Sequence, residues 1–300
     1  MSNNGALIAS SPSRAPLTGA TAASDTTLAS LGGAGLCEVK FVSEALAGQD
    51  VAMTFVAPFA CAAILQPADF QTLGVETSAP ASIDGLLVCF TPSGAATSLE
   101  EQRRVDQWIE TSPAPGRPVI DLLIRGDRIR WRPGRCVIQG AADRFRELLQ
   151  AVTSFAFYEA RLRKLEADLE AVWPTAERDI VLTRRLTGRS LERWQHVDNM
   201  TEEMGRRRLE FARLEPHLEK PPLSLSAVSQ RAIAELTVQA DVEDRLVYVD
   251  DRLEVFEELY QRTNERLCEY SYFRRENAME LGIVVAIVLQ VAVEIVFLMK

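Results

Sequence analysis

Arginine side chains around a tryptophan give this sequence its clearest candidate for binding chemistry. The segment at residues 126–134 reads GDRIRWRPG, and the residues that could form one patch are Arg128, Arg130, Trp131 and Arg132. Guanidinium groups bind phosphate through paired hydrogen bonds and an aromatic ring can stack on a base, so this patch could bind phosphate or RNA. Alternating arginines are also typical of the solvated face of a half-buried strand. Both interpretations are compatible with the sequence.

Residues that could support catalysis or metal binding are few and scattered. The chain has 5 cysteines and 2 histidines, with no Cys-x-x-Cys pair. It also lacks the glycine-rich phosphate loops, the His-Glu-x-x-His zinc motif and the Gly-x-Ser-x-Gly nucleophile motif. Adjacent acidic pairs such as Asp250–Asp251 would point in different directions on a helix, which does not suit acid–base catalysis. We therefore expect buried free thiols, no metal site, no cofactor and no enzymatic activity.

The charge composition of the chain indicates which classes of partner it can bind. The 300 residues include 42 acidic and 33 basic side chains, which gives a net charge of −9. Affinity for nucleic acids comes largely from neutralising phosphates, so the acidic excess disfavours a nucleic-acid partner for the chain as a whole. The length suits one large domain or two smaller ones.

Five segments with different residue patterns divide the chain. Short β-rich runs between turn residues at 36–140 predict an α/β domain, and the Ala/Ser/Thr/Gly-rich tail at 1–35 is expected to be disordered. Apolar residues at spacings of three and four then predict a helical region at 141–222, a coiled-coil stalk helix at 223–277 and a transmembrane helix at 278–300. The predicted fold class is therefore α+β: an N-terminal α/β domain, long α-helices and one C-terminal transmembrane helix.

The stalk helix carries a heptad seam that could join identical chains. Its members, which alternate spacings of four and three, are Val242, Leu246, Val249, Leu253, Phe256, Tyr260, Thr263, Leu267 and Tyr270. This is the a/d pattern of a left-handed coiled coil. No proline or glycine lies between Ser226 and Gly282, so we expect one unbroken helix there. Either the preceding helix folds back over the seam or identical chains cover it, and the pattern allows both.

The most apolar stretch of the chain lies at residues 281–299. As a helix it would be about 28 Å long, close to the thickness of a bilayer's hydrocarbon core. We therefore expect a tail anchor that leaves the bulk of the chain in the cytoplasm, at the bacterial inner membrane or alternatively the mitochondrial one. A helix–helix interface within the span is predicted from residues four apart, Ala278, Gly282, Ala286, Gln290 and Glu294. Glu294 could line that interface or an aqueous path, or it could reach the far headgroups.

Three segments of the C-terminal half share their order and spacing with a known family. They read SFAFYEARLRKLE at 154–166, DRLVYVDDRLEVFEELYQRTNERL at 244–267 and MELGIVVAIVLQVAVEI at 279–295. The residues in matching places are Arg245, Val249, Arg252, Leu253, Glu280 and Glu294. In these segments the chain resembles the Required for Meiotic Nuclear Division family. The resemblance implies a membrane-anchored, self-assembling scaffold without catalytic residues, whose mitochondrial relatives support mitochondrial translation.

These patterns together favour a tail-anchored, self-associating scaffold or adaptor that presents its α/β domain to an unknown protein partner at the membrane surface. The architecture is also similar to CorA magnesium channels, so a cation channel made of a ring of single spans, with Glu294 facing inward, is an alternative. The second span and the Gly-Met-Asn loop of those channels are absent from the sequence. A third hypothesis is an RNA- or phosphate-binding adaptor that uses the arginine patch.

Overall fold

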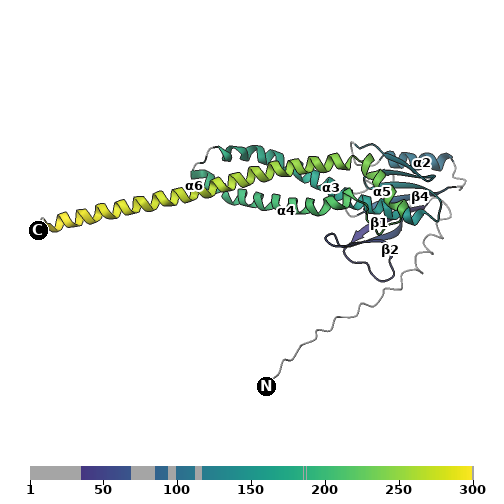
Figure 1. Cartoon of the computed structure of the whole chain (residues 1–300), viewed down its shortest axis with the longest axis horizontal. Helices are drawn as coiled ribbons and strands as arrows, with labels where there is room; N and C mark the ends of the chain where they lie inside the picture. Colours follow the sequence, from purple (N-terminus) through teal and green to yellow (C-terminus); the bar gives the residue numbers. More distant parts are fainter. Residues whose placement is uncertain are drawn as a thin grey trace, which may run out of the picture.

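The chain forms an α/β head from which a long helical arm projects (Figure 1). The computed structural model describes residues 35–68, 85–93, 99–111, 117–184, 186 and 188–298, without the side chains of 101, 189, 293, 294 and 296–298. The tail predicted at 1–35 lies outside these residues up to position 34, and Gly35 already belongs to the first strand.

Within the described residues, seven strands form one mixed sheet in the head. Their bounds are β1 Gly35–Val42, β2 Asp50–Phe55, β3 Cys61–Ala68, β4 Gly85–Pro92, β5 Ile120–Ile124, β6 Asp127–Arg132 and β7 Arg135–Gly140. The order across the sheet is β2-β3-β1-β4-β7-β6-β5, and β4 pairs with β7 in parallel. Central strands β4 and β7 bury nearly every side chain, whereas edge strand β5 alternates between buried and exposed positions. The contrast arises because helices cover both faces of the sheet at its centre.

Helices cover the two faces of the sheet unequally. On one face, α2 (Leu99–Glu110) packs Val105 and Ile109 against apolar residues of β1, β4 and β7. On the other face lie the first half of α3 (Phe145–Asp179) and the short helix α5 (Ala227–Gln239). In Figure 1, α2 lies along the upper side of the head and α5 lies near the start of the arm.

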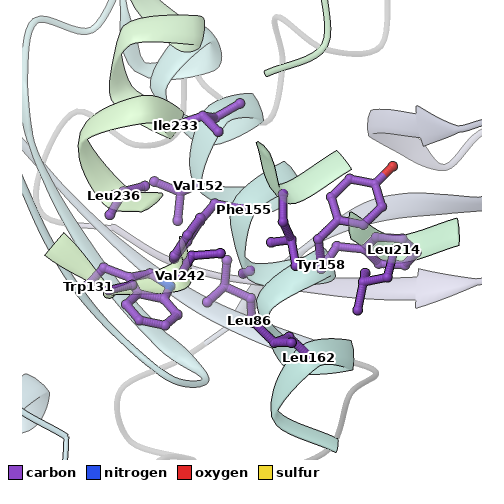
Figure 2. Close-up of a cluster of buried hydrophobic side chains, with 14 of the residues drawn as sticks. Leu86, Trp131, Val152, Phe155, Tyr158, Leu162, Leu214, Ile233, Leu236 and Val242 are labelled. Atoms are coloured by element: carbon purple, nitrogen blue, oxygen red, sulfur yellow. The ribbon is translucent and has the colours of Figure 1, made fainter. Parts of the chain in front are cut away.

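The core of the head extends into helices beyond residue 140, where the sequence placed the end of the α/β domain. Trp131 of β6 meets Phe155 of α3 edge to face, with ring centroids 4.9 Å apart, and both lie in the buried cluster of Figure 2. Phe55 of β2 stacks on Phe157 of α3 at 3.8 Å. The inner face of the sheet is therefore buried only when α3 and α5 are in place.

Three long helices build the arm. Helix α3 runs out from the head and continues past Pro174. The 3₁₀ turns η1 (Ile180–Thr183) and η2 (Gly188–Arg193) lead into α4 (Trp194–Glu219), which packs beside α3 and α6. After α5, helix α6 (Val242–Leu298) runs out along the arm and then extends beyond the other helices (Figure 1).

The helix predicted to run unbroken from Ser226 to Gly282 is interrupted, so that prediction is wrong. Ser226 does cap α5, because its Oγ accepts the backbone N–H of Ser229 at 3.2 Å. Asp241, between α5 and α6, has a φ of +50°, a left-handed conformation that commonly ends helices. Helix α5 stays on α3 because the hydroxyl of Ser229 donates to the carbonyl of Glu147 at 2.8 Å. Helix α6 can therefore start in a new direction, along the arm.

In the described part of the chain, the structure contains no helix with both the length and the apolar character needed to cross a membrane. The transmembrane helix predicted at 278–300 is therefore wrong, as is the tail anchor based on it. The apolar stretch is the end of α6, whose earlier part is charged and packed in the arm. The cation-channel alternative depended on the same span.

Candidate functional site

The heptad seam of α6 is buried inside the arm of a single chain. Its residues with at most 6% exposed surface are Val242, Leu246, Val249, Leu253, Phe256, Tyr260, Thr263 and Leu267. They pack against α4, α3 and α5, and Phe256 meets Trp173 of α3 edge to face at 4.8 Å. Tyr270, the last residue of the predicted seam, is half-buried. Of the two arrangements that the sequence allows, the structure shows helices of the same chain folded back over the seam.

At the far end of the arm, a buried carboxylate ties three segments together. Asp179 closes α3 and is fully buried. It pairs with Arg193, its Oδ2 lies 2.8 Å from Nε2 of His196, and it accepts the hydroxyl of Tyr260 at 3.3 Å. Burial, followed by the negative charge of Asp179, raises the pKa of Tyr260. The hydroxyl is therefore protonated at neutral pH, and the cluster fixes the direction in which α6 leaves the arm.

Residues 275–298 of α6, which we term the distal segment, are exposed wherever the structure describes their side chains. The large apolar residues there are between 49% and 65% exposed. Four residues of the helix–helix interface predicted from the sequence are exposed on this segment: Ala278, Gly282, Ala286 and Gln290. The side chain of the fifth, Glu294, is outside the described set. A Cβ added to Gly282 would meet nothing within 4 Å, so the described chain leaves this face of the helix uncovered.

The heptad register of the buried seam continues through the distal segment. After Tyr270, the same alternation of spacings reaches Arg274 and Asn277, at the point where the cover from the rest of the arm ends. It then passes through the aliphatic residues Leu281, Val284, Val288, Val291 and Ile295. This continuation was readable in the sequence, but the apolar composition of the stretch led to a membrane assignment instead. The small residues Gly282 and Ala286, with Gln290, lie on the opposite side of the helix from this register.

The predicted arginine patch is divided between the two faces of β6. Trp131 points into the core and is 2% exposed, whereas the three arginines of the patch lie on the face toward α2. Arg128 donates to Asp121 of the neighbouring strand at 2.8 Å, and this hydrogen bond lowers the pKa of Asp121. Arg130 pairs with Asp106 of α2. The ring and the guanidinium groups therefore do not form one surface, and these two arginines are engaged by carboxylates.

The cysteines are free thiols, and most have raised pKa values. Burial raises the pKa of Cys37 and of Cys89 to about 12, and it raises that of Cys136 as well. Cys61 and Cys268 are partly exposed, so the expectation of buried thiols holds for three of the five. A thiol that stays protonated at neutral pH is a poor nucleophile. Among the described residues, no group of His, Cys, Asp and Glu is placed to hold a metal ion.

An ion network joins α3 to α6 where the arm leaves the head. Arg245 of α6 donates to both carboxylate oxygens of Glu166, at 2.7 and 2.9 Å, and to Glu159 at 3.2 Å. Burial alone would lower the pKa of Arg245, but the hydrogen bonds and charges of Glu166 and Glu159 outweigh it, so the pKa is raised. The network could not be read from the sequence, because its partners lie 79 and 86 positions from Arg245.

Comparison with known proteins adds no family. No protein-family model matches the chain, and no curated protein matches it. The resemblance to the Required for Meiotic Nuclear Division family therefore rests on the three segments quoted above and stays a prediction.

Proposed function

We propose that the protein is a self-associating scaffold without catalytic activity, which presents its α/β head to a protein partner at the end of a rigid arm. The observation that carries the proposal is the exposed continuation of the heptad register along the distal segment. In this arrangement, the distal segments of several copies pair with one another, and the heads point outward from the bundle.

The exposed register has the chemistry of a helix–helix interface. Leu281, Val284, Val288, Val291 and Ile295 are each 49–65% exposed and occupy alternating a and d positions. Burying a fully exposed side chain of this kind contributes about 1.5–3 kcal/mol. These are about half exposed, so each contributes about half of that, and the five together can offset the entropy lost on association. β-branched residues at d, as at Val284 and Val291, favour three or four strands over two.

The absence of catalysis in this proposal is supported by how the reactive groups of the described residues are engaged. Asp179 and Glu159, the two most buried carboxylates of the arm, are held by cationic side chains. The thiols of Cys37, Cys89 and Cys136 stay protonated at neutral pH because they are buried. Each of these groups stabilises the fold where it lies.

The test is the mass of the full-length protein in solution, measured by light scattering, with and without charges in the register. We expect wild-type protein to form a closed assembly of several 33.3 kDa chains. The double variant Leu281→Lys with Val288→Lys should be monomeric, because it places charges in the apolar seam. The matched control Ile283→Lys with Leu289→Lys adds the same charges to the opposite side of the helix and should keep the wild-type mass.

Two outcomes would contradict the proposal. If the seam variant keeps the wild-type mass, or if both variants become monomeric, the heptad register is not the interface. If wild-type protein is monomeric and sediments with phospholipid vesicles, the exposed residues contact lipid and not other copies.

A further inference from the structure

The groove between α3 and α6, next to the ion network at the base of the arm, contains an open pocket of about 590 Å³. This volume lies in the range of pockets that bind small molecules, about 300–1,000 Å³. Four arginines line it: Arg117, Arg163, Arg245 and Arg252. The acidic residues of the lining are Glu166, Glu170 and Asp244, and Tyr248 forms part of the wall.

Two of the four arginines have unused hydrogen-bonding capacity. Arg245 and Arg252 are engaged by Glu166 and Glu170, at 2.7 and 2.5 Å. In contrast, the guanidinium group of Arg163 approaches a carboxylate of the described chain at 3.7 Å, beyond hydrogen-bonding distance. Arg117 makes one long hydrogen bond, at 3.4 Å. Their side chains are 27% and 33% exposed, so both can reach a ligand in the pocket.

One buried donor beside the pocket is also unpaired. Nη1 of Arg245 is buried and has no hydrogen-bond partner among the described residues. Arg245, Arg117 and Arg163 together surround two carboxylates, those of Glu159 and Glu166. This cluster therefore holds one more positive than negative charge, and a buried unpaired donor is costly unless an acceptor is nearby. An oxyanion held by the partly exposed Arg117 and Arg163 would balance the charge of this cluster.

The wall of the pocket offers a surface for a planar group. Tyr248 is 48% exposed, and the guanidinium group of Arg252 lies over its ring at 3.9 Å from the centroid. Arg252 also lies 5.5 Å from the ring centroid of Trp173, which helps to hold it in place. Aromatic rings and guanidinium planes of this kind are platforms on which bases stack.

We propose that this groove binds a nucleoside phosphate, with Arg117 and Arg163 holding the phosphate oxygens and the base lying against Tyr248. The proposal is independent of self-association, because the groove lies at the base of the arm and the distal segment lies at its other end. Arginine pairs suit phosphate because their donors match its oxygens in a planar fork. Arg252, Glu170 and Asp244 together add one negative charge, so the groove as a whole is neutral, and phosphate and base are both needed for binding.

The test is calorimetric titration of the full-length protein with ATP, adenosine and inorganic pyrophosphate, without divalent cations. We expect ATP to bind, and adenosine and pyrophosphate to bind at least about tenfold more weakly, because each lacks half of the recognition. The double variant Arg117→Gln with Arg163→Gln should weaken ATP binding by at least about tenfold, since charge-assisted hydrogen bonds are lost. Tyr248→Leu should weaken ATP binding and leave pyrophosphate binding unchanged.

The matched control is Arg206→Gln, which removes an exposed arginine paired with Glu202 elsewhere on the arm. This variant should bind ATP as the wild type does. The proposal is overturned if wild-type protein does not bind ATP, if adenosine binds as tightly as ATP, or if the double variant and the control have equal affinity. Circular dichroism of each variant ensures that a loss of binding is not a loss of fold.

Discussion

The two halves of α6 carry the same heptad pattern and have opposite surroundings. From Val242 to Leu267 the seam residues are at most 6% exposed, whereas Leu281, Val288 and Ile295 in the same register are 52–65% exposed. Both stretches belong to one continuous helix. The pattern therefore identifies which face of a helix is apolar, and the rest of the chain decides whether that face is covered.

The two halves of α6 also differ in the ion pairs beside their apolar face. Beside the buried seam, Arg208 of α4 pairs with Asp250 of α6, and Arg252 of α6 pairs with Glu170 of α3 at 2.5 Å. Such pairs specify which neighbour each face meets. The distal segment has aliphatic residues on every side, with no ion pair among its described side chains. Because no such ion pairs select a particular neighbour, the distal segments of identical chains can pack against one another.

The largest difference between the halves should appear in stability. Phe256→Ala in the buried seam should lower the free energy of unfolding by about 3–5 kcal/mol, because it leaves a cavity beside Trp173. Urea unfolding followed by circular dichroism measures this loss. If Phe256→Ala leaves the unfolding midpoint unchanged and instead reduces the mass of the assembly, the seam at Phe256 joins different chains and is not buried within one chain.

A smaller loss of unfolding free energy is expected at Tyr260, near the end of the buried half of α6. Tyr260→Phe removes a hydroxyl that donates to the buried carboxylate of Asp179 at 3.3 Å, so we expect a loss of about 1.5–3 kcal/mol at neutral pH. The same urea titration measures it. His196→Gln is a useful comparison, because Arg193 and Tyr260 still hold Asp179 in that variant.

The pH dependence of this contact follows from the raised pKa of Tyr260. The folded state retains the phenolic proton to a higher pH than the unfolded state, so the stabilisation is complete below about pH 10 and is lost as the pH rises above it. Between pH 10 and 12, the stability of the wild type should fall more steeply with pH than that of Tyr260→Phe. Equal slopes would show that burial and Asp179 do not raise the pKa of this hydroxyl.

The sequence predicted the sheet-then-helix order and the seam of α6, because periodic apolar patterns report local structure directly. It did not predict the break at Asp241, since no Gly or Pro marks it; there the left-handed backbone and the anchoring of α5 on α3 end the helix. It also placed a transmembrane helix at 278–300 on apolar composition alone, and the described residues contain no such helix.

The candidate sites were harder to predict than the elements that hold them. The arginine patch was identified from adjacent residues, but the alternation of β6 sends Trp131 into the core and pairs Arg130 with a carboxylate of α2. The groove that we propose as a binding site brings Arg117 beside Glu166 and Arg245, residues far apart along the chain. Contacts of this kind depend on tertiary packing, and local spacing carries no signal for them.

The smallest effect on stability is expected in the distal segment, where a substitution should change association and leave the fold of the monomer unchanged. Val288→Ala in the distal segment should change the unfolding free energy of the monomer by less than about 0.5 kcal/mol, because the side chain is 62% exposed and leaves no cavity. The same substitution should weaken association by about tenfold for each copy in the assembly, since it removes about two buried methyl groups from each copy in the seam. Leu289→Ala removes more apolar surface from the opposite side of the helix and should leave association unchanged. Sedimentation equilibrium measures the association constant of each variant. If the two variants lose association equally, the distal helix associates through its overall apolar surface and not through the heptad positions that continue from the buried half.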